Sequence, residues 1–218
     1  MDINEQWQEL LKDHMKDMQE LSAITERKLK EKYGEEFSVQ RYRFNESDNS
    51  LTWFVTPKQK TDLLFFAMMS EEGKLSDNYV SRKQMYELEK GLSFVLEKAG
   101  VRSLVRALPV SEEGNKEDLY LMPYDYISIH QIKWIHLAIV ADTDEKPVDV
   151  LVPVLKALYE PLKTDITVDL CGCSPESFEQ YRDMYAKCIN ISTTLLERYE
   201  VKSRFRGYIV KQTVQEEI

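Results

Sequence analysis

The sequence lacks the features of a membrane or secreted protein. No apolar run reaches the roughly 18 residues that a membrane-spanning helix needs. The first residues show no basic stretch followed by an apolar one, so no secretory signal peptide is expected. There are 3 cysteines, and so small and odd a number argues against a disulfide framework. These absences predict a soluble, cytoplasmic protein without a membrane partner.

Glycine and proline are also scarce, with 7 of each in 218 residues. No glycine-serine linker and no low-complexity tract is present, which indicates a chain that folds over most of its length. The hydrophobic content of 43% is enough to bury the core of one large domain or two small ones. The formal net charge of -9 opposes binding to phosphate backbones, so no nucleic-acid partner is predicted.

The common catalytic motifs are missing from the sequence as well. It contains no glycine-rich P-loop, no dinucleotide-binding glycine motif, no nucleophile elbow and no H-E-x-x-H zinc motif. Standard P-loop enzymes, Rossmann dehydrogenases, α/β-hydrolases and the common zinc peptidases are therefore excluded. No cofactor is predicted, and whether the protein is an enzyme stays open.

The hydrophobic periodicity predicts an α+β fold of two related halves, built on largely antiparallel sheets with packed helices. The first half, 1–110, has the predicted order α-β-β-β-α-β, and the second half, 111–218, has the order β-α-β-α-β. The charged segment 111–118 is the expected boundary. The long first helix is expected to lie across a sheet or to form a dimerisation arm.

Two apolar strings suggest an internal repeat. Leu64–Glu71 and Ile135–Asp142 each read as a buried strand that runs into an acidic turn, and each precedes a helix and another strand. The triplets around Tyr42 and Phe205 both have arginines on either side of an aromatic residue. An internal duplication packed as one unit is one interpretation, and chance similarity between short strings is the other.

Two helix starts are specified by capping residues. Ser81 and Gln84 have the spacing of a capping box, which predicts a helix that begins at Ser81 and ends at Gly100. Ser174 and Pro175 predict the N-cap and first turn of a later helix.

The pair Cys171 and Cys173 is the strongest candidate for chemistry. It lies between a predicted strand and a predicted helix N-terminus, whose dipole favours a thiolate. With His130 and His136 it can form a metal site of His and Cys ligands, or a thiol pair with a histidine base. The alternative is that both cysteines are small buried residues and both histidines are structural.

Aromatic and basic residues form the candidate binding surfaces. An anion-binding face is predicted from the arginines of two strands, Arg41, Arg43, Arg204 and Arg206. The alternative is that these side chains only protect exposed strands. A pocket or partner surface is predicted from Tyr124, Tyr126 and Trp134, with burial in the core as the alternative.

The segments Tyr33-Gly34-x-x-Phe37 and Ser76-Asp77-Asn78-Tyr79, around three predicted strands, resemble uncharacterised small proteins of Gram-positive bacteria. The resemblance covers roughly the first hundred residues and implies no activity and no site residues. The α-β-β-β-α order also resembles secretion-chaperone-like domains, at the level of the fold.

The function expected from the sequence is therefore non-catalytic binding. The predicted partner is another protein or a second copy of the chain, as in a homodimer. The alternative hypothesis is a metal- or thiol-dependent enzyme that uses Cys171, Cys173, His130 and His136.

Overall fold

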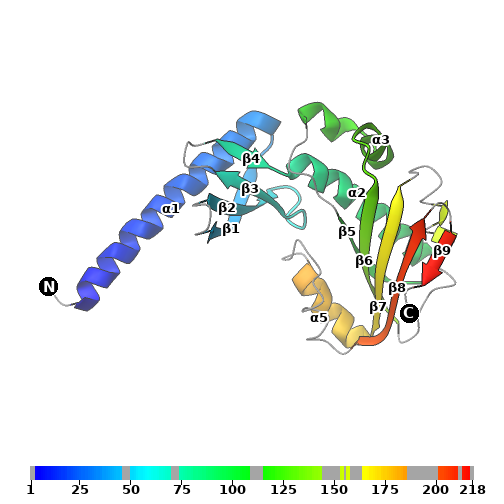
Figure 1. The fold of residues 1–218 in the computed structure, drawn as a ribbon. Coiled ribbons are helices and arrows are strands. Elements are labelled where there is room, and N and C mark those ends of the chain that lie inside the picture. The colour runs from blue at the N-terminus through cyan, green and yellow to red at the C-terminus, as the bar shows by residue number, and fades with distance from the viewer. Residues whose placement is uncertain are drawn as a thin grey trace. The chain divides into compact units, whose positions relative to one another are not determined.

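The structure is a computed structural model that describes residues 3–45, 50–69, 74–108, 115–143, 153–154, 156–157, 164–185, 201–210 and 213–216. The chain forms two compact units, Met1–Tyr79 and Val80–Ile218. Helices combine with antiparallel and mixed sheets, which confirms the predicted α+β class (Figure 1).

The first unit is a long helix with a four-stranded antiparallel sheet. Helix α1 covers Ile3–Tyr33, and Gly34 ends it with a φ of 81°, a conformation that favours glycine. The strands follow in the order β1-β2-β3-β4, so β1 lies at one edge of the sheet. Their bounds are β1 Phe37–Asn45, β2 Ser50–Pro57, β3 Phe65–Met69 and β4 Leu75–Asp77. The first three strands form an antiparallel meander, which matches the three consecutive strands predicted here, and β4 was not predicted.

An aromatic cluster forms the core of this unit. Phe37 packs edge-on against Phe65 and Tyr79, with ring centroids 5.6 and 5.1 Å apart. Tyr33 joins the cluster with a centroid 4.9 Å from Tyr79. Leu29 is also fully buried, so the C-terminal half of α1 lies across the sheet, which was one of the two predicted roles. Such edge-to-face contacts add to the hydrophobic stabilisation of the core.

The second unit holds a five-stranded mixed sheet in the order β5-β6-β7-β8-β9. Strands β6 and β7 are parallel, and the other neighbours are antiparallel. The strands are β5 Ser103–Leu108, β6 Trp134–Asp142, β7 Asp165–Cys173, β8 Val201–Val210 and β9 Thr213–Glu216. The described helices are α2 Tyr79–Lys98, the short 3-10 helix η1 Lys116–Tyr120, α3 Pro123–Ile129 and α5 Pro175–Tyr185.

The division into units differs from the predicted boundary at 110/111. The chain divides at Tyr79/Val80 instead, because β5 pairs with β6 in the second sheet. The charged segment 111–118 therefore connects neighbouring strands of one sheet. The two predicted repeats also pair differently: β7 lies beside β6, whereas β5 does not join β3. The internal duplication stays a prediction.

The start of α2 differs from the predicted capping box. The helix begins at Tyr79, two residues before Ser81, and the buried carboxylate of Asp77 accepts the Tyr79 N–H at 3.0 Å. Gln84 donates instead to the carbonyl oxygens of Asp118 and Leu121, at 2.6 and 3.2 Å. The S-x-x-Q spacing was misleading because a buried acid upstream already satisfies the first helical N–H.

The second capping prediction is confirmed. Helix α5 begins at Pro175, and the Oγ of Ser174 accepts the N–H of Ser177 at 3.3 Å. The helix predicted between β6 and β7 lies largely outside the described residues. The segment between β5 and β6 contains η1 and α3, two helices that the predicted order of elements does not include.

Candidate functional site

The two cysteines lie in an apolar cluster rather than in a site for chemistry. Cys171 and Cys173 are 4% and 3% exposed, and they pack with Val140 of β6 and with Phe178 and Tyr181 of α5. Strand alternation places both thiols on the face of β7 that α5 covers. Their environment is that of small core residues, which was the structural alternative.

The histidines bind separate carboxylates. His130 Nε2 lies 3.0 Å from Asp118 Oδ2, and His136 Nε2 lies 2.8 Å from Asp169 Oδ2. Among the described residues, no group of three or more His, Cys, Asp or Glu side chains is arranged to hold a metal ion. The structure therefore does not bring His130, His136 and the two cysteines together, because each histidine has its own acid within hydrogen-bonding distance.

The three predicted aromatic binding residues have different environments. Tyr126 is fully buried and packs on His130, with ring centroids 4.5 Å apart, so it belongs to the core. Tyr124 and Trp134 are exposed. Trp134 stacks on His136 and donates a hydrogen bond to Thr167 Oγ1 at 2.9 Å. The prediction of one surface from all three residues is wrong for Tyr126.

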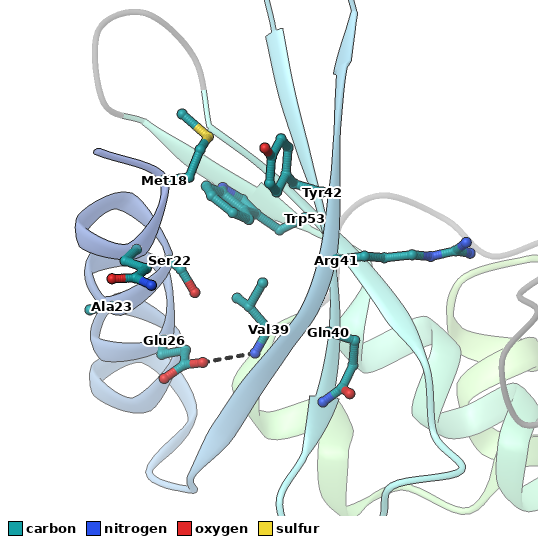
Figure 2. A pocket seen from close by; sticks show the side chains of 10 residues that line it. Met18, Ser22, Ala23, Glu26, Val39, Gln40, Arg41, Tyr42 and Trp53 are labelled. Atoms are coloured by element: carbon teal, nitrogen blue, oxygen red, sulfur yellow. Dashed lines mark hydrogen bonds between the residues drawn. The ribbon is translucent and has the colours of Figure 1, made fainter. Parts of the chain in front are cut away.

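The arginines of β1 lie on the face of the sheet away from α1, because a bulge interrupts the alternation of this strand. The register between β1 and β2 shifts between Val39 and Arg41, where Gln40 forms a bulge. A bulge adds one residue and reverses the alternation that follows it. As a result, Tyr42 pairs with Trp53 on the face toward α1, whereas Arg41 points away from α1 and lies over the ring of Phe54 at 4.3 Å (Figure 2).

The arginines of β8 are placed only by their register. Arg204 and Arg206 stand opposite Cys171 and Asp169 of β7. Their side chains lie outside the described part of the structure. The Arg41/Arg43 pair and the Arg204/Arg206 pair belong to different sheets.

A groove lies between α1 and the edge strand β1 in the first unit. Its volume is about 590 Å³. Figure 2 shows the helix on one side and β1 on the other, with the Trp53 ring between Met18 and Tyr42. The lining residues are Met18, Gln19, Ser22, Ala23, Glu26, Val39, Gln40, Arg41, Tyr42 and Trp53.

One end of the groove is closed by a hydrogen bond between helix and strand. The N–H of Val39 donates to Glu26 Oε1 at 2.8 Å. Because Val39 lies on an edge strand, this N–H points away from the sheet and would otherwise need a partner. The edge of β5 has the same arrangement: the N–H of Ala107 donates to Glu89 Oε1 of α2 at 2.8 Å. A helix glutamate thus satisfies one edge N–H in each unit.

The other end of the groove is aromatic and partly open. Trp53 forms its floor and is 1% exposed, whereas Tyr42 is 44% exposed and packs edge-on against it at 5.7 Å. The indole Nε1–H of Trp53 has no hydrogen-bond partner among the described residues. Met18 lies beside the ring in Figure 2. A flexible thioether next to two aromatic rings is suited to accommodate an apolar side chain of varied shape.

The groove lining contains three ionisable side chains, Glu26, Arg41 and Tyr42. Among its ten lining residues, Glu26 is the only carboxylate, and one of its oxygens is already bound to the Val39 N–H. The lining contains no histidine, cysteine or lysine.

Sequence reasoning did not identify Trp53 or Glu26 as site residues. One signal was present: Phe37 and Val39 alternate with polar residues, but Tyr42 and Phe44 then fall on the opposite parity. An apolar pattern that changes parity within one strand indicates a bulge, and bulges often lie next to functional sites.

No family model matches this chain, and no curated protein matches it. Its fold is similar to that in the crystal structure of a DUF5037 family protein from Ruminococcus gnavus ATCC 29149. The TM-score is 0.72, over 90% of this chain and 95% of that chain, with 14% sequence identity. At this identity the likeness shows the fold alone. None of the described helices is long and apolar enough to cross a membrane.

Proposed function

We propose that this protein is a non-catalytic binding protein and that its ligand is a segment of another protein chain or of a second copy. The groove between α1 and β1 carries this proposal. Its volume of about 590 Å³ lies within the range of binding pockets. Half of its ten lining residues are apolar or aromatic, and the others supply polar groups. The burial of Cys171 and Cys173 as thiols supports a reducing compartment such as the cytoplasm.

The exposed aromatic residues near the groove support a protein ligand. Tyr42 and Phe44, on β1, are 44% and 52% exposed. Tyr and Trp residues contribute large contact areas at protein interfaces, and a buried aromatic anchor in a pocket usually supplies much of the binding energy. In the groove, Trp53 is positioned to contact such an anchor from the ligand.

Filling the groove should abolish ligand binding without unfolding the protein. Ala23 is an exposed helix residue that lines the groove, so Ala23→Trp places a large ring in the space where the ligand would bind. We expect wild-type protein to enrich ligands from a displayed library of random linear peptides, and Ala23→Trp to enrich none of them. Light scattering on both proteins measures self-association through the same groove.

The matched control is Glu20→Trp, which adds the same ring at an exposed position of α1 outside the groove lining. This variant should enrich the same peptides as the wild type. Equal enrichment by Ala23→Trp and wild type, or the absence of both enrichment and self-association in wild type, would contradict the proposed function.

A further inference from the structure

We propose that the groove binds an extended peptide that adds to the edge of β1 as a further strand, with apolar residues toward α1 and acidic residues toward Arg41 and Arg43. This inference rests on the proposed function, because it names the class of ligand for the same groove. Strand addition to an exposed sheet edge beside a helix is a general mode of peptide recognition, in which main-chain hydrogen bonds give affinity and alternate side chains give specificity.

The hydrogen bond of Val39 identifies which residues of β1 face outward. In an antiparallel pair, alternate residues turn their N–H and C=O groups toward the partner strand and away from it. The N–H of Val39 points away from β2, toward Glu26. Without a bulge, Arg41 and Arg43 would have the same main-chain orientation as Val39. The extra residue at Gln40 shifts this orientation to Tyr42 and Phe44. These two residues therefore direct their main-chain groups to the outer edge of the sheet.

This part of the edge differs from the others that the structure describes. Strand β1 has nine residues, whereas the opposite edge strand of the same sheet, β4, has three. Folded proteins usually keep edge strands short, covered or charged, because a long open edge pairs with other chains. Glu26 covers β1 at Val39, next to the groove, and the strand continues beyond this point to Asn45.

The two faces of β1 specify the side chains of the added strand. Val39 and Tyr42 line the groove on the α1 side, whereas Arg41 points to the opposite face (Figure 2). Arg43 follows Arg41 at the same parity. A peptide strand beside β1 places every second side chain in the groove and the others next to the two guanidinium groups. Opposite charges on directly neighbouring strands are favourable, so acidic residues fit these positions.

The same charges argue against a second copy of β1 as the added strand. Antiparallel pairing of two β1 edges around Tyr42 would place Arg41 of each chain opposite Arg43 of the other, and pairing around Arg43 would place the two Arg43 side chains together. Like charges directly opposite each other destabilise a strand pair. The net charge of -9 does not outweigh the local arginines, since distant charges are screened over about 8 Å at physiological salt.

The test is the residue pattern of peptides enriched by the full chain from a displayed library of random linear peptides. The expected peptides alternate apolar and acidic residues. A synthetic peptide of the enriched sequence should then bind roughly tenfold more weakly to Phe44→Pro than to Phe44→Ala, because only proline removes the outward N–H while both lose the ring. Circular dichroism shows whether Phe44→Pro keeps its fold.

A second measurement does not depend on the protein variant. In the proposed pairing, every second N–H of the peptide faces β1. Methylating these amide nitrogens should also weaken binding to wild type roughly tenfold, because a methylated amide cannot donate a hydrogen bond to the β1 edge. Two results would overturn strand addition and leave the proposed function standing. One is enrichment of groove-dependent peptides whose apolar residues are three and four apart, the spacing of a helical ligand. The other is equal binding of methylated and unmethylated peptides. Enrichment that Ala23→Trp does not reduce, or no enrichment at all, would overturn both.

Discussion

Replacing Glu89 with glutamine should destabilise the second unit by about 3–5 kcal/mol, the usual effect of removing one partner from a buried ion pair. Glu89 is 2% exposed and lies between Arg82 and Arg106, which are 0% and 1% exposed. Arg82 donates from both terminal nitrogens to the two Glu89 oxygens at 2.8 Å. Arg106 Nη1 lies 3.3 Å from Glu89 Oε2, and the Ala107 N–H is bound to Oε1.

The size of the effect follows from the charges that would remain. Arg82 and Arg106 both form ion pairs with the Glu89 carboxylate, so neutralising it removes a shared anion from two buried guanidinium groups. Urea unfolding of the full chain, followed by circular dichroism, measures the change in unfolding free energy. The control is Glu97→Gln, at an exposed position of the same helix, which should change stability by less than about 0.5 kcal/mol. Equal effects of the two substitutions would contradict the structure of this cluster.

Replacing Asp77 with alanine should destabilise the first unit by about 3 kcal/mol or more, since hydrogen bonds to a charged acceptor contribute about 1.5–3 kcal/mol each. The Asp77 side chain is fully buried. It accepts hydrogen bonds from the Tyr33 hydroxyl at 2.6 Å, from Lys32 Nζ at 2.9 Å and from the Tyr79 N–H at 3.0 Å. Alanine would leave the Tyr33 hydroxyl and the Tyr79 N–H buried without this acceptor, within the first unit.

A double-mutant cycle with Tyr33→Phe isolates the hydrogen bond between the two side chains. Burial, and secondly the hydrogen bond to Asp77, raises the pKa of Tyr33 well above its ordinary value. A raised pKa means that the contribution of the neutral phenol is fully present below pH about 10 and is lost above it. The coupling energy between Tyr33 and Asp77 should therefore not change with pH around neutrality. If Asp77→Ala lowered the unfolding free energy by no more than Tyr33→Phe does, the three hydrogen bonds to Asp77 would be contradicted.

Several regular elements could be predicted from the sequence because local patterns and single residues determine them. Helical spacing of apolar residues, Gly34 at the end of α1, and Ser174 with Pro175 at the start of α5 all depend on local chemistry. The meander of β1, β2 and β3 followed from alternation and short turns.

The groove could not be predicted from the sequence, because it depends on contacts between segments that are distant in the chain. One extra residue at Gln40 exchanged the faces of the arginines and the aromatic residues of β1, relative to uniform alternation. The change of parity after Val39 signals this bulge, but it does not show what packs against the strand. The groove itself is formed by two segments, Met18–Glu26 and Val39–Tyr42, together with Trp53 from a third. Neither segment carries a motif, because an apolar groove that binds through shape and main-chain groups has no fixed residue spacing.

The His and Cys prediction shows the opposite error. Cys171 and Cys173 satisfied a plausible spacing, but strand alternation placed both under Phe178 and Tyr181 of α5. His136 lies within hydrogen-bonding distance of Asp169 on the neighbouring strand. Residue type alone did not distinguish ligands from packed side chains, since that distinction depends on which acids and apolar groups the topology brings beside them.

The open edge of β1 is the central claim, and amide hydrogen exchange in the unliganded chain tests it most directly. We predict slow exchange for the N–H of Val39 and of Ala107, which glutamates hold, and fast exchange for the N–H of Tyr42 and Phe44, which lie on the open part of the edge. A saturating peptide from the library should slow the exchange of Tyr42 and Phe44. Protection of both amides before ligand is added, or fast exchange that persists at saturation, would contradict the account.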